Sequence, residues 1–230
     1  WVVGPTIGGL LAARSYLLLF IADAIGSTIT ALIVYRLIPE TQPTPAARNS
    51  ADSESLLATL AGYGVVARDK LYIGYLVVSM LMLVVYQQMY NTLGVYLRDV
   101  HGVPDRGYGL LLSLDAFTVV LLQFWVTRRV KGRPAMLMMA LGTFLYLVGF
   151  SLFGFVASYA LFVVAILFIT FGEMIVMPVG AALAARFAPA ALRGRYMAFQ
   201  HLAHAIPSTI GPAAAGFILD NYNPNWVWYA

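Results

Sequence analysis

Long apolar runs separated by short polar segments dominate the hydropathy pattern of the chain. The runs cover residues 15–35, 71–97, 107–127, 134–185 and 196–219. A helix needs about 20 apolar residues to cross a bilayer, and each run is long enough for that. The 134–185 run is too long for one span at about 1.5 Å of rise per residue, so we expect two spans that turn near 154–158. The pattern therefore predicts six complete membrane-spanning helices.

The polar segments and the two ends add to this pattern. Residues 37–70 form a long polar segment with several prolines, which predicts a linker. Some of its apolar residues could share one face of a short amphipathic helix on the membrane surface, namely Leu56, Leu57, Leu60 and Val65. A disordered tether explains the segment equally well. Apolar stubs at 1–13 and 226–230 indicate a piece of a longer membrane protein.

Composition supports a membrane protein. Of the 230 residues, 61% are hydrophobic and 10% are charged, whereas a soluble domain carries roughly 25% charged residues. This excludes most cytosolic enzymes, nucleic-acid-binding proteins and disordered chains. Because the chain has no cysteine, disulfides, cysteine-ligated zinc and thiol catalysis are excluded as well.

The basic residues predict the orientation of the helices. If the helices alternate in direction, the linker, the loop at 128–133 and the loop at 186–195 lie on one side of the membrane. Together with Arg36, which directly precedes the linker, these three segments hold eleven of the 14 lysines and arginines. Cytoplasmic loops carry an excess of basic residues, so this side is predicted to be cytoplasmic. The basic clusters thus indicate topology, and no nucleic-acid partner is expected.

Two distant segments resemble each other. Gly4-Pro5 in the first stub matches Gly211-Pro212 in the last complete span, and Gly9 matches Gly216. The two segments lie six helices apart and run in the same direction. Such a parallel repeat is typical of transporters built from two similar halves. The match is short, so coincidence is the alternative interpretation.

On these motifs the chain resembles the major facilitator superfamily, from the fifth helix to the start of the twelfth. Gly4, Pro5, Gly8 and Gly9 are similar to the end of the fifth-helix motif of the drug–proton antiporters in that family. The other matching residues form two basic loop motifs: Arg128, Arg129, Lys131 and Arg133 between helices eight and nine, and Arg193, Gly194 and Arg195 at the entry into helix eleven. The first loop departs from the family pattern, because Thr127 stands where an aspartate is expected.

The resemblance implies an all-α, polytopic membrane helix bundle of two halves, of which this is a partial chain. It assigns 1–36 to the last two helices of the N-terminal half, the first of them truncated. It assigns 37–70 to a cytoplasmic linker and 71–230 to a six-helix C-terminal half with a truncated last helix. It also implies that the kinked, closely packed Gly-Pro segments seal one side of a central cavity and favour export. Plain helix packing is the alternative.

Acidic residues inside the spans are the first candidates for function, because charged groups are costly in a bilayer. Asp115 lies in the outer half of its span and Glu173 near the middle of its own. By the resemblance, both helices line the cavity, whereas the helix of Asp23 is peripheral. A buried carboxyl can hold a proton and release it when the cavity opens to water. A structural, hydrogen-bonded acid is the alternative for each.

Two further groups of polar residues lie within spans. His201 and His204 are one helical turn apart and could belong to a proton relay with Glu173, or bind substrate, or simply pack. We expect no metal site there, because no carboxylate is near in sequence. One span carries a run of hydrogen-bonding side chains that should face protein or water, namely Tyr86, Gln87, Gln88, Tyr90 and Asn91. Aromatic and amide groups with few charges suit a lipophilic substrate.

The sequence thus predicts a multi-pass secondary transporter of a prokaryotic plasma membrane that works by alternating access. The best-supported activity is proton-coupled efflux of a lipophilic small molecule. Uptake or export of a metabolite, peptide or lipid is the alternative, and an intramembrane enzyme is a further one that no protease or hydrolase motif supports. We expect no enzyme activity and no cofactor. The expected partners are a small-molecule substrate, protons and the lipid bilayer, and the full-length protein is expected to be monomeric.

Overall fold

The computed structural model describes residues 15–38, 56–189 and 192–229, and every regular element among them is a helix. These residues fall into two units by their contacts, residues 1–59 and 60–230. In the first unit, α2 comprises Tyr16–Leu37. Ser15 precedes it as the N-cap, and its side chain accepts a hydrogen bond from the amide of Leu17. The hydroxyls of Thr28 and Thr30 donate to carbonyls one turn earlier, so these polar groups are satisfied within the helix.

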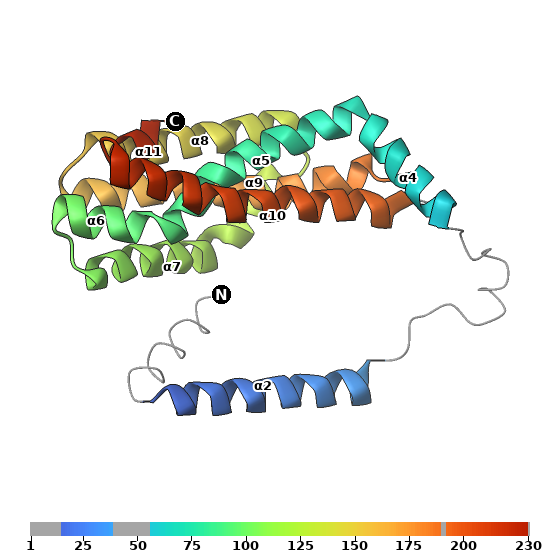
Figure 1. Ribbon diagram of the computed structural model, residues 1–230, viewed down its shortest axis with the longest axis horizontal. Helices are drawn as coiled ribbons and strands as arrows, with labels where there is room; N and C mark the ends of the chain where they lie inside the picture. Colours follow the sequence, from blue (N-terminus) through green and yellow to red (C-terminus); the bar gives the residue numbers. More distant parts are fainter. Residues whose placement is uncertain (1–14, 39–55, 190–191, 230) are drawn as a thin grey trace. The chain divides into compact units, whose positions relative to one another are not determined.

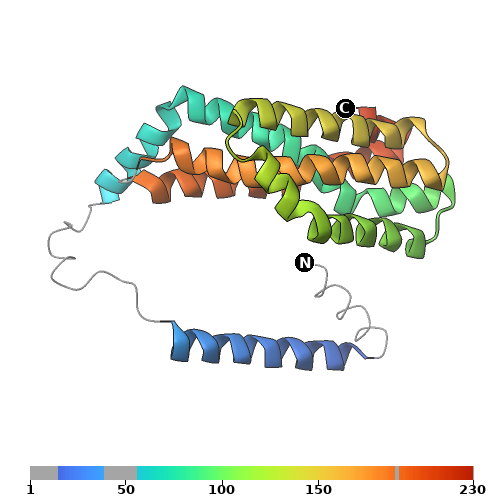
Figure 2. The same cartoon turned by 180° about the vertical axis from the view of Figure 1, so that it is seen from behind.

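The second unit is a bundle of long helices (Figure 1). Its elements are α4 (Leu56–Arg68), α5 (Lys70–Asn91), α6 (Leu93–His101), α7 (Asp105–Val130), α8 (Ala135–Phe155), α9 (Tyr159–Phe187), α10 (Arg193–Asn221) and α11 (Trp226–Tyr229). The helix α9 packs against α7, α8 and α10, and α10 also runs along α5, as both Figure 1 and Figure 2 show.

Small residues let the central helices approach each other. A Cβ added at Gly149 of α8 would lie 2.5 Å from Ile169 Cγ1 on α9, and one added at Gly172 of α9 would lie 2.8 Å from the carbonyl oxygen of Gly142. Side chains at Gly149 and Gly172 would force the two backbones apart, and close approach at small residues is typical of membrane helices. At the other end of this contact, Phe153 and Phe162 are fully buried.

Six of the described helices are long and apolar enough to cross a membrane. They correspond to the six spans predicted from the five apolar runs, and the longest run divides into two helices as expected. Its first helix, α8, ends at Phe155, and its second, α9, begins at Tyr159 after an N-cap at Ser158. The prediction of an all-α, polytopic membrane bundle is confirmed.

The 71–97 run is not the single helix that its apolar length predicted. α5 ends at Asn91, Thr92 caps it, and α6 continues from Leu93 to His101. The side chain of Thr92 donates a 2.6 Å hydrogen bond to Gln88 Oε1. The backbone bonds from the Thr92 amide to Gln88 and from the Tyr96 amide to Thr92 are kept, so the interruption is confined to Thr92.

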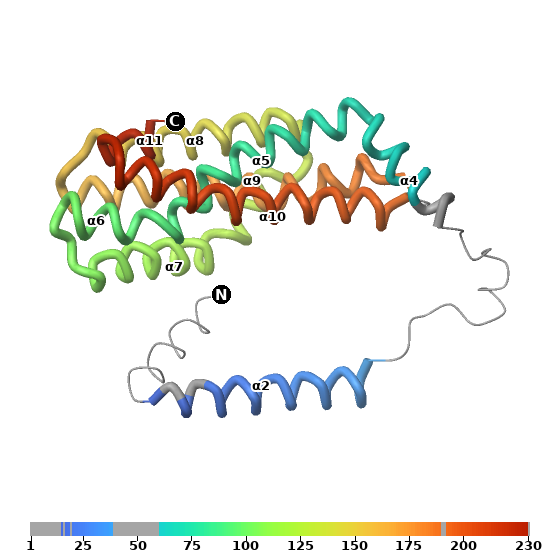
Figure 3. Tube along the Cα trace, in the orientation of Figure 1, coloured from blue at the N-terminus to red at the C-terminus, as the bar shows by residue number. Residues whose placement is uncertain are grey.

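The end of the predicted linker is helical. α4 and α5 meet at a bend (Figure 3), where the carboxylate of Asp69 caps α5 by accepting a 3.1 Å hydrogen bond from the amide of Tyr72. Within α4, Val66 is fully buried in a cluster with Tyr72 of α5 and Tyr196 of α10, whereas Leu60 and Val65 are exposed. The structure thus gives α4 one packed face and one apolar exposed face. That it lies on a membrane surface stays a prediction.

Candidate functional site

The two acids of the second unit that were predicted to line a cavity lie near each other inside the bundle. Asp115 of α7 is 5% exposed, and Glu173 is the central residue of α9. Asp115 is an electrostatic neighbour of the Glu173 carboxyl. Thr170, one turn before Glu173, donates a 2.6 Å hydrogen bond from its hydroxyl to Asp115 Oδ1. Helices α7 and α9 therefore bring both carboxyls to one place.

Three tyrosines surround these carboxyls. The hydroxyls of Tyr86 and Tyr90, one turn apart on α5, lie 3.2 Å from each other, and Tyr86 is also a neighbour of the Glu173 carboxyl. The ring of Tyr146 from α8 lies 5.6 Å from that of Tyr86. Four helices thus contribute to a group of polar side chains, which we call the acid–tyrosine cluster: Tyr86, Tyr90, Asp115, Tyr146, Thr170 and Glu173. Of these, Tyr90 is 45% exposed.

Two atoms of the cluster retain unused hydrogen-bonding capacity. The Tyr146 hydroxyl and Glu173 Oε2 are buried and have no hydrogen-bond partner among the described residues. Buried polar groups are nearly always paired, so an unpaired one needs an explanation. A carboxyl oxygen and a phenol hydroxyl that are both unpaired form a place where a proton, a water molecule or a polar ligand can bind.

The amides of α5 are arranged differently from the tyrosines. Gln88 is buried and bonds within its own helix, because its Nε2 donates to the carbonyl oxygen of Val84 at 2.8 Å. Its side chain lies against Gly211 of α10, where an added Cβ would be 2.9 Å from Nε2. Asn91 is exposed and donates to the backbone of Gln87. Of the five polar residues expected to edge the cavity, the structure brings Tyr86 and Tyr90 to the cluster.

The histidines of α10 lie apart from the acids. His201 and His204 are both exposed, and His201 is the electrostatic neighbour of His204. No hydrogen bond or electrostatic contact found among the described residues joins either one to Glu173. A role for these histidines in a relay or in substrate contact stays a prediction.

Tyr146 and Thr170 are members of the cluster that the sequence did not single out. Tyr146 is one of 14 tyrosines, and no local pattern separates it from those that pack in the core. Thr170 had a usable signal, because it lies three residues before Glu173 and so on the same helical face. Threonine is common in membrane helices, where its hydroxyl bonds its own backbone, and this hides such a signal.

The Gly-Pro repeat is described in its second copy, and Gly4, Pro5, Gly8 and Gly9 lie outside the described residues. In α10, Gly211 is buried against α5, whereas nothing lies within 4 Å of a Cβ added at Gly216. Pro212 lies inside the same helix. The second copy therefore combines one close helix contact with one open glycine.

The residues of the two predicted basic loops lie at or next to the ends of helices. Arg128 and Arg129 lie in the last turn of α7, with guanidinium groups over the rings of Phe124 and Trp125 at 5.5 and 4.8 Å. Lys131 caps α7, Gly132 adopts a left-handed φ of 85°, and Arg133 follows. In the second loop, Arg193 begins α10, Gly194 has open space around it, and Arg195 lies against Gly62 of α4.

The family model of the Major Facilitator Superfamily matches residues 1–212 of the chain. The chain belongs to the major facilitator superfamily. This confirms the resemblance drawn from the glycine, proline and arginine motifs, and with the six apolar helices it makes the protein an integral, multi-pass membrane protein.

Two curated relatives match the chain. One is described as a transporter of this superfamily and the other as an antiporter. An uncharacterized MFS-type transporter, YttB of Bacillus subtilis, is 26% identical over 224 residues, which cover 96% of this chain and 54% of the relative. A Na⁺, Li⁺, K⁺/H⁺ antiporter of Planococcus maritimus is 22% identical over 231 residues, which cover 92% of this chain and 54% of the relative. The chain thus spans about half the length of both. Both relatives are transport proteins, in agreement with the expectation that the chain is not an enzyme.

A solved structure has the same fold. The crystal structure of a POT family transporter in complex with 5-aminolevulinic acid superimposes with a TM-score of 0.62 at 16% identity, over 94% of this chain and 50% of that one. At this level of identity the likeness shows the fold alone. It supports the arrangement of helices that brings the acid–tyrosine cluster together.

Proposed function

We propose that the chain belongs to a proton-coupled secondary transporter that works by alternating access. In this proposal residues 1–36 end one half of the transporter, residues 37–70 are the cytoplasmic linker, and residues 71–230 form most of the other half. The acid–tyrosine cluster then lies inside one of two halves that rock around a central site. A chain of this length supplies one wall of that site, so transport needs the full-length protein.

The observation that carries the proposal is the unpaired Oε2 of Glu173 at the centre of α9, beside Asp115. Ionisable residues inside membrane spans mark ion or proton pathways, because a structural role rarely repays their cost. Tyrosine and threonine hydroxyls around the carboxyls provide groups that a proton can pass between. Uptake of a proton here would change the charge of the cluster, and this change couples proton entry to movement of the halves.

For the cargo, we propose a lipophilic small molecule that is exported. The tyrosines of the cluster offer ring surface with few charged groups, which suits such a ligand. The likeness of Gly4, Pro5, Gly8 and Gly9 to the fifth-helix motif of drug–proton antiporters supports export.

The test uses the full-length protein in proteoliposomes with an imposed pH gradient. Ethidium serves as a lipophilic probe, and both its movement and the proton flux are followed. We expect Glu173→Gln to abolish pH-dependent transport while leaving expression unchanged. The matched control is Asp220→Asn, which removes an exposed carboxylate near the end of α10. Unchanged pH dependence in Glu173→Gln would remove Glu173 from the mechanism, and a protein that moves no solute and no proton on any gradient would contradict transport itself.

A second candidate cargo is a monovalent cation, exchanged for protons. Two neighbouring carboxyls with hydroxyl oxygens around them offer the oxygen ligands that hard cations prefer, and one relative is described as a Na⁺, Li⁺, K⁺/H⁺ antiporter. The same proteoliposomes separate the two cargoes. If adding NaCl or KCl collapses the pH gradient and ethidium does not, the cation is the cargo.

A further inference from the structure

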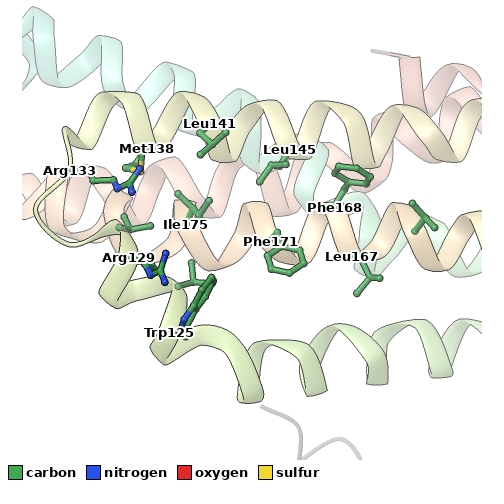
Figure 4. A pocket seen from close by; sticks show the side chains of 13 residues that line it. Trp125, Arg129, Arg133, Met138, Leu141, Leu145, Leu167, Phe168, Phe171 and Ile175 are labelled. Carbon is green, nitrogen blue, oxygen red and sulfur yellow. The ribbon is translucent and has the colours of Figure 1, made fainter.

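A cavity lined by residues of α7, α8 and α9 includes no member of the acid–tyrosine cluster. Its volume is about 530 Å³, within the range in which protein cavities hold one ligand. Trp125 and Arg129 of α7, Arg133 of the following loop, Leu141 of α8 and Phe168 of α9 are among its lining residues. Figure 4 shows the arginines and Trp125 at one end, near the α7–α8 loop, and the apolar side chains continuing along α9. We call this cavity the α7–α9 groove.

The walls of the groove are apolar and open to the surroundings. Trp125 is 54% exposed, Leu141 44% and Phe168 37%. These three residues lie in helices that qualify as membrane spans. An exposed apolar surface at this place in a membrane protein faces acyl chains instead of water.

The charged end of the groove carries positive charge, and no carboxylate in the described part of the chain forms an ion pair with it. The ion pairs found among the described residues belong to Arg98, and none of them involves Arg129 or Arg133. The guanidinium of Arg129 lies 4.8 Å from the centre of the Trp125 ring. A cation–π contact of this kind leaves the N–H groups of the arginine able to donate hydrogen bonds to an acceptor. Guanidinium groups bind phosphate oxygens in pairs of hydrogen bonds, so this end fits a phosphate.

The end that carries these charges also matches the depth of a lipid headgroup. Arg129 lies in the last turn of a membrane-spanning helix and Arg133 lies just after it. Tryptophan is enriched at the boundary between acyl chains and headgroups. By the distribution of basic residues this end faces the cytoplasm, where anionic lipids give the leaflet its negative potential. A phosphate at Arg129 and Arg133 would therefore have its acyl chains directed along α9.

We propose that the α7–α9 groove binds one anionic glycerophospholipid of the inner leaflet, with its phosphate on Arg129 and Arg133 and one acyl chain against Leu141 and Phe168. A second protein copy fits less well, because it would bury two cations that have no partner on this side. An uncharged lipophilic molecule would leave the same two cations unused.

The test measures lipid binding to the full-length protein in detergent by native mass spectrometry. The probes are dioleoyl phosphatidylglycerol and dioleoyl phosphatidylcholine, which share their chains and differ in net charge. We expect one tightly bound phosphatidylglycerol and weaker binding of phosphatidylcholine. Since each basic residue near the surface contributes about 1 kcal/mol, the double variant Arg129→Gln/Arg133→Gln should weaken phosphatidylglycerol binding at least tenfold.

Two further variants make the result specific. Arg128→Gln removes a charge from the same turn, but Arg128 lies over Phe124 and does not line the groove, so binding should stay within twofold. Leu141→Trp fills the apolar wall and should weaken binding with both arginines present. Thermal unfolding of each variant checks that it is folded.

Three outcomes would overturn the proposal. The first is an equal loss in Arg128→Gln, which would indicate attraction to the whole loop instead of a site. The second is equal binding of the two lipids, which would remove the phosphate contact to the arginines. The third is a lipid-free dimer that Leu141→Trp disrupts, which would make the groove an interface between copies.

Discussion

The hydroxyl of Thr170 on α9 donates a 2.6 Å hydrogen bond to the carboxylate of Asp115 on α7. Both side chains are buried, Thr170 completely and Asp115 at 5% exposure. The bond joins two membrane-spanning helices at the acid–tyrosine cluster. It also fixes where the Asp115 carboxylate points, and so how far it lies from Glu173 and the tyrosines.

We expect Thr170→Val to destabilise the bundle and to change the pH dependence of transport. Valine keeps the shape but leaves the Asp115 carboxylate without its donor, and the loss of such a buried bond costs about 1–3 kcal/mol of the free energy of unfolding. Thermal unfolding of the full-length protein measures the first effect, and proteoliposome transport between pH 6 and pH 8 measures the second. The control is Thr118→Val in α7, whose buried hydroxyl bonds the carbonyl oxygen of Leu114 in its own helix. Equal effects of the two substitutions would contradict a special role for the bond to Asp115.

A second hydrogen bond joins the start of α5 to the start of α10. Tyr196 donates from its hydroxyl to Asp69 Oδ2 at 2.8 Å, while Asp69 Oδ1 caps α5 by accepting from the amide of Tyr72. We expect Tyr196→Phe to lower the free energy of unfolding by about 1 kcal/mol. Asp69→Ala should cost about 1 kcal/mol more, because it also removes the cap.

Asp69→Asn provides the control for this pair, because an asparagine oxygen can still cap α5. Its loss of stability should be smaller than that of Asp69→Ala, and the measurement is chemical or thermal unfolding of all three variants. If Asp69→Ala costs no more than Tyr196→Phe, the cap contributes nothing.

The two glycines of the Gly-Pro repeat in α10 should respond differently to alanine. A Cβ at Gly211 would lie 2.9 Å from Gln88 Nε2, whereas one at Gly216 has no neighbour within 4 Å. We expect Gly211→Ala to lower the unfolding temperature, because α5 must shift or Gln88 must lose its bond to the carbonyl oxygen of Val84. Gly216→Ala should leave the unfolding temperature unchanged or raise it, since alanine is the better helix former. The reverse order would show that α5 and α10 do not meet at Gly211.

Stability at the outer end of the bundle should fall in acid because of His101. The ring of His101 packs edge-on against Tyr96 and Phe162, and burial lowers the pKa of His101 below its ordinary value of 6.5. The folded state therefore binds this proton less readily than the unfolded state does. Its contribution to stability is complete above pH 6.5 and decreases as the pH falls below that value.

The measurement is the unfolding temperature at pH 8 and at pH 5. We expect the difference between the two to be smaller in His101→Phe than in the unaltered protein, because phenylalanine packs without a charge to take up. His201→Phe changes an exposed histidine and should leave the difference as it was. A difference that stays the same in His101→Phe would assign the acid sensitivity to other groups.

The sequence predicted the spans well because membrane crossing depends on local composition. Five apolar runs predicted six spans and gave six membrane-length helices, and the turn between Phe155 and Tyr159 fell where Gly154 and Ser158 suggested it. The break at Thr92 was missed, because a one-residue interruption of a helix within an apolar run leaves no trace in hydropathy. The family was also predictable, since the Gly-Pro and arginine motifs are short stretches that can be recognised in the sequence without the structure.

For the candidate site, the sequence by itself determined that Asp115 and Glu173 lie within spans, because each is an isolated acid in a long apolar run. Only the tertiary structure decided that these two acids meet, that Tyr86, Tyr146 and Thr170 join them, and that Gln88 instead packs against Gly211. The α7–α9 groove was likewise decided by the packing of three helices. The physical reason is that depth in the membrane follows from position along one helix. The neighbours of a side chain depend on how each helix is rotated about its axis, and that rotation is set by close contacts at residues such as Gly149, Gly172 and Gly211.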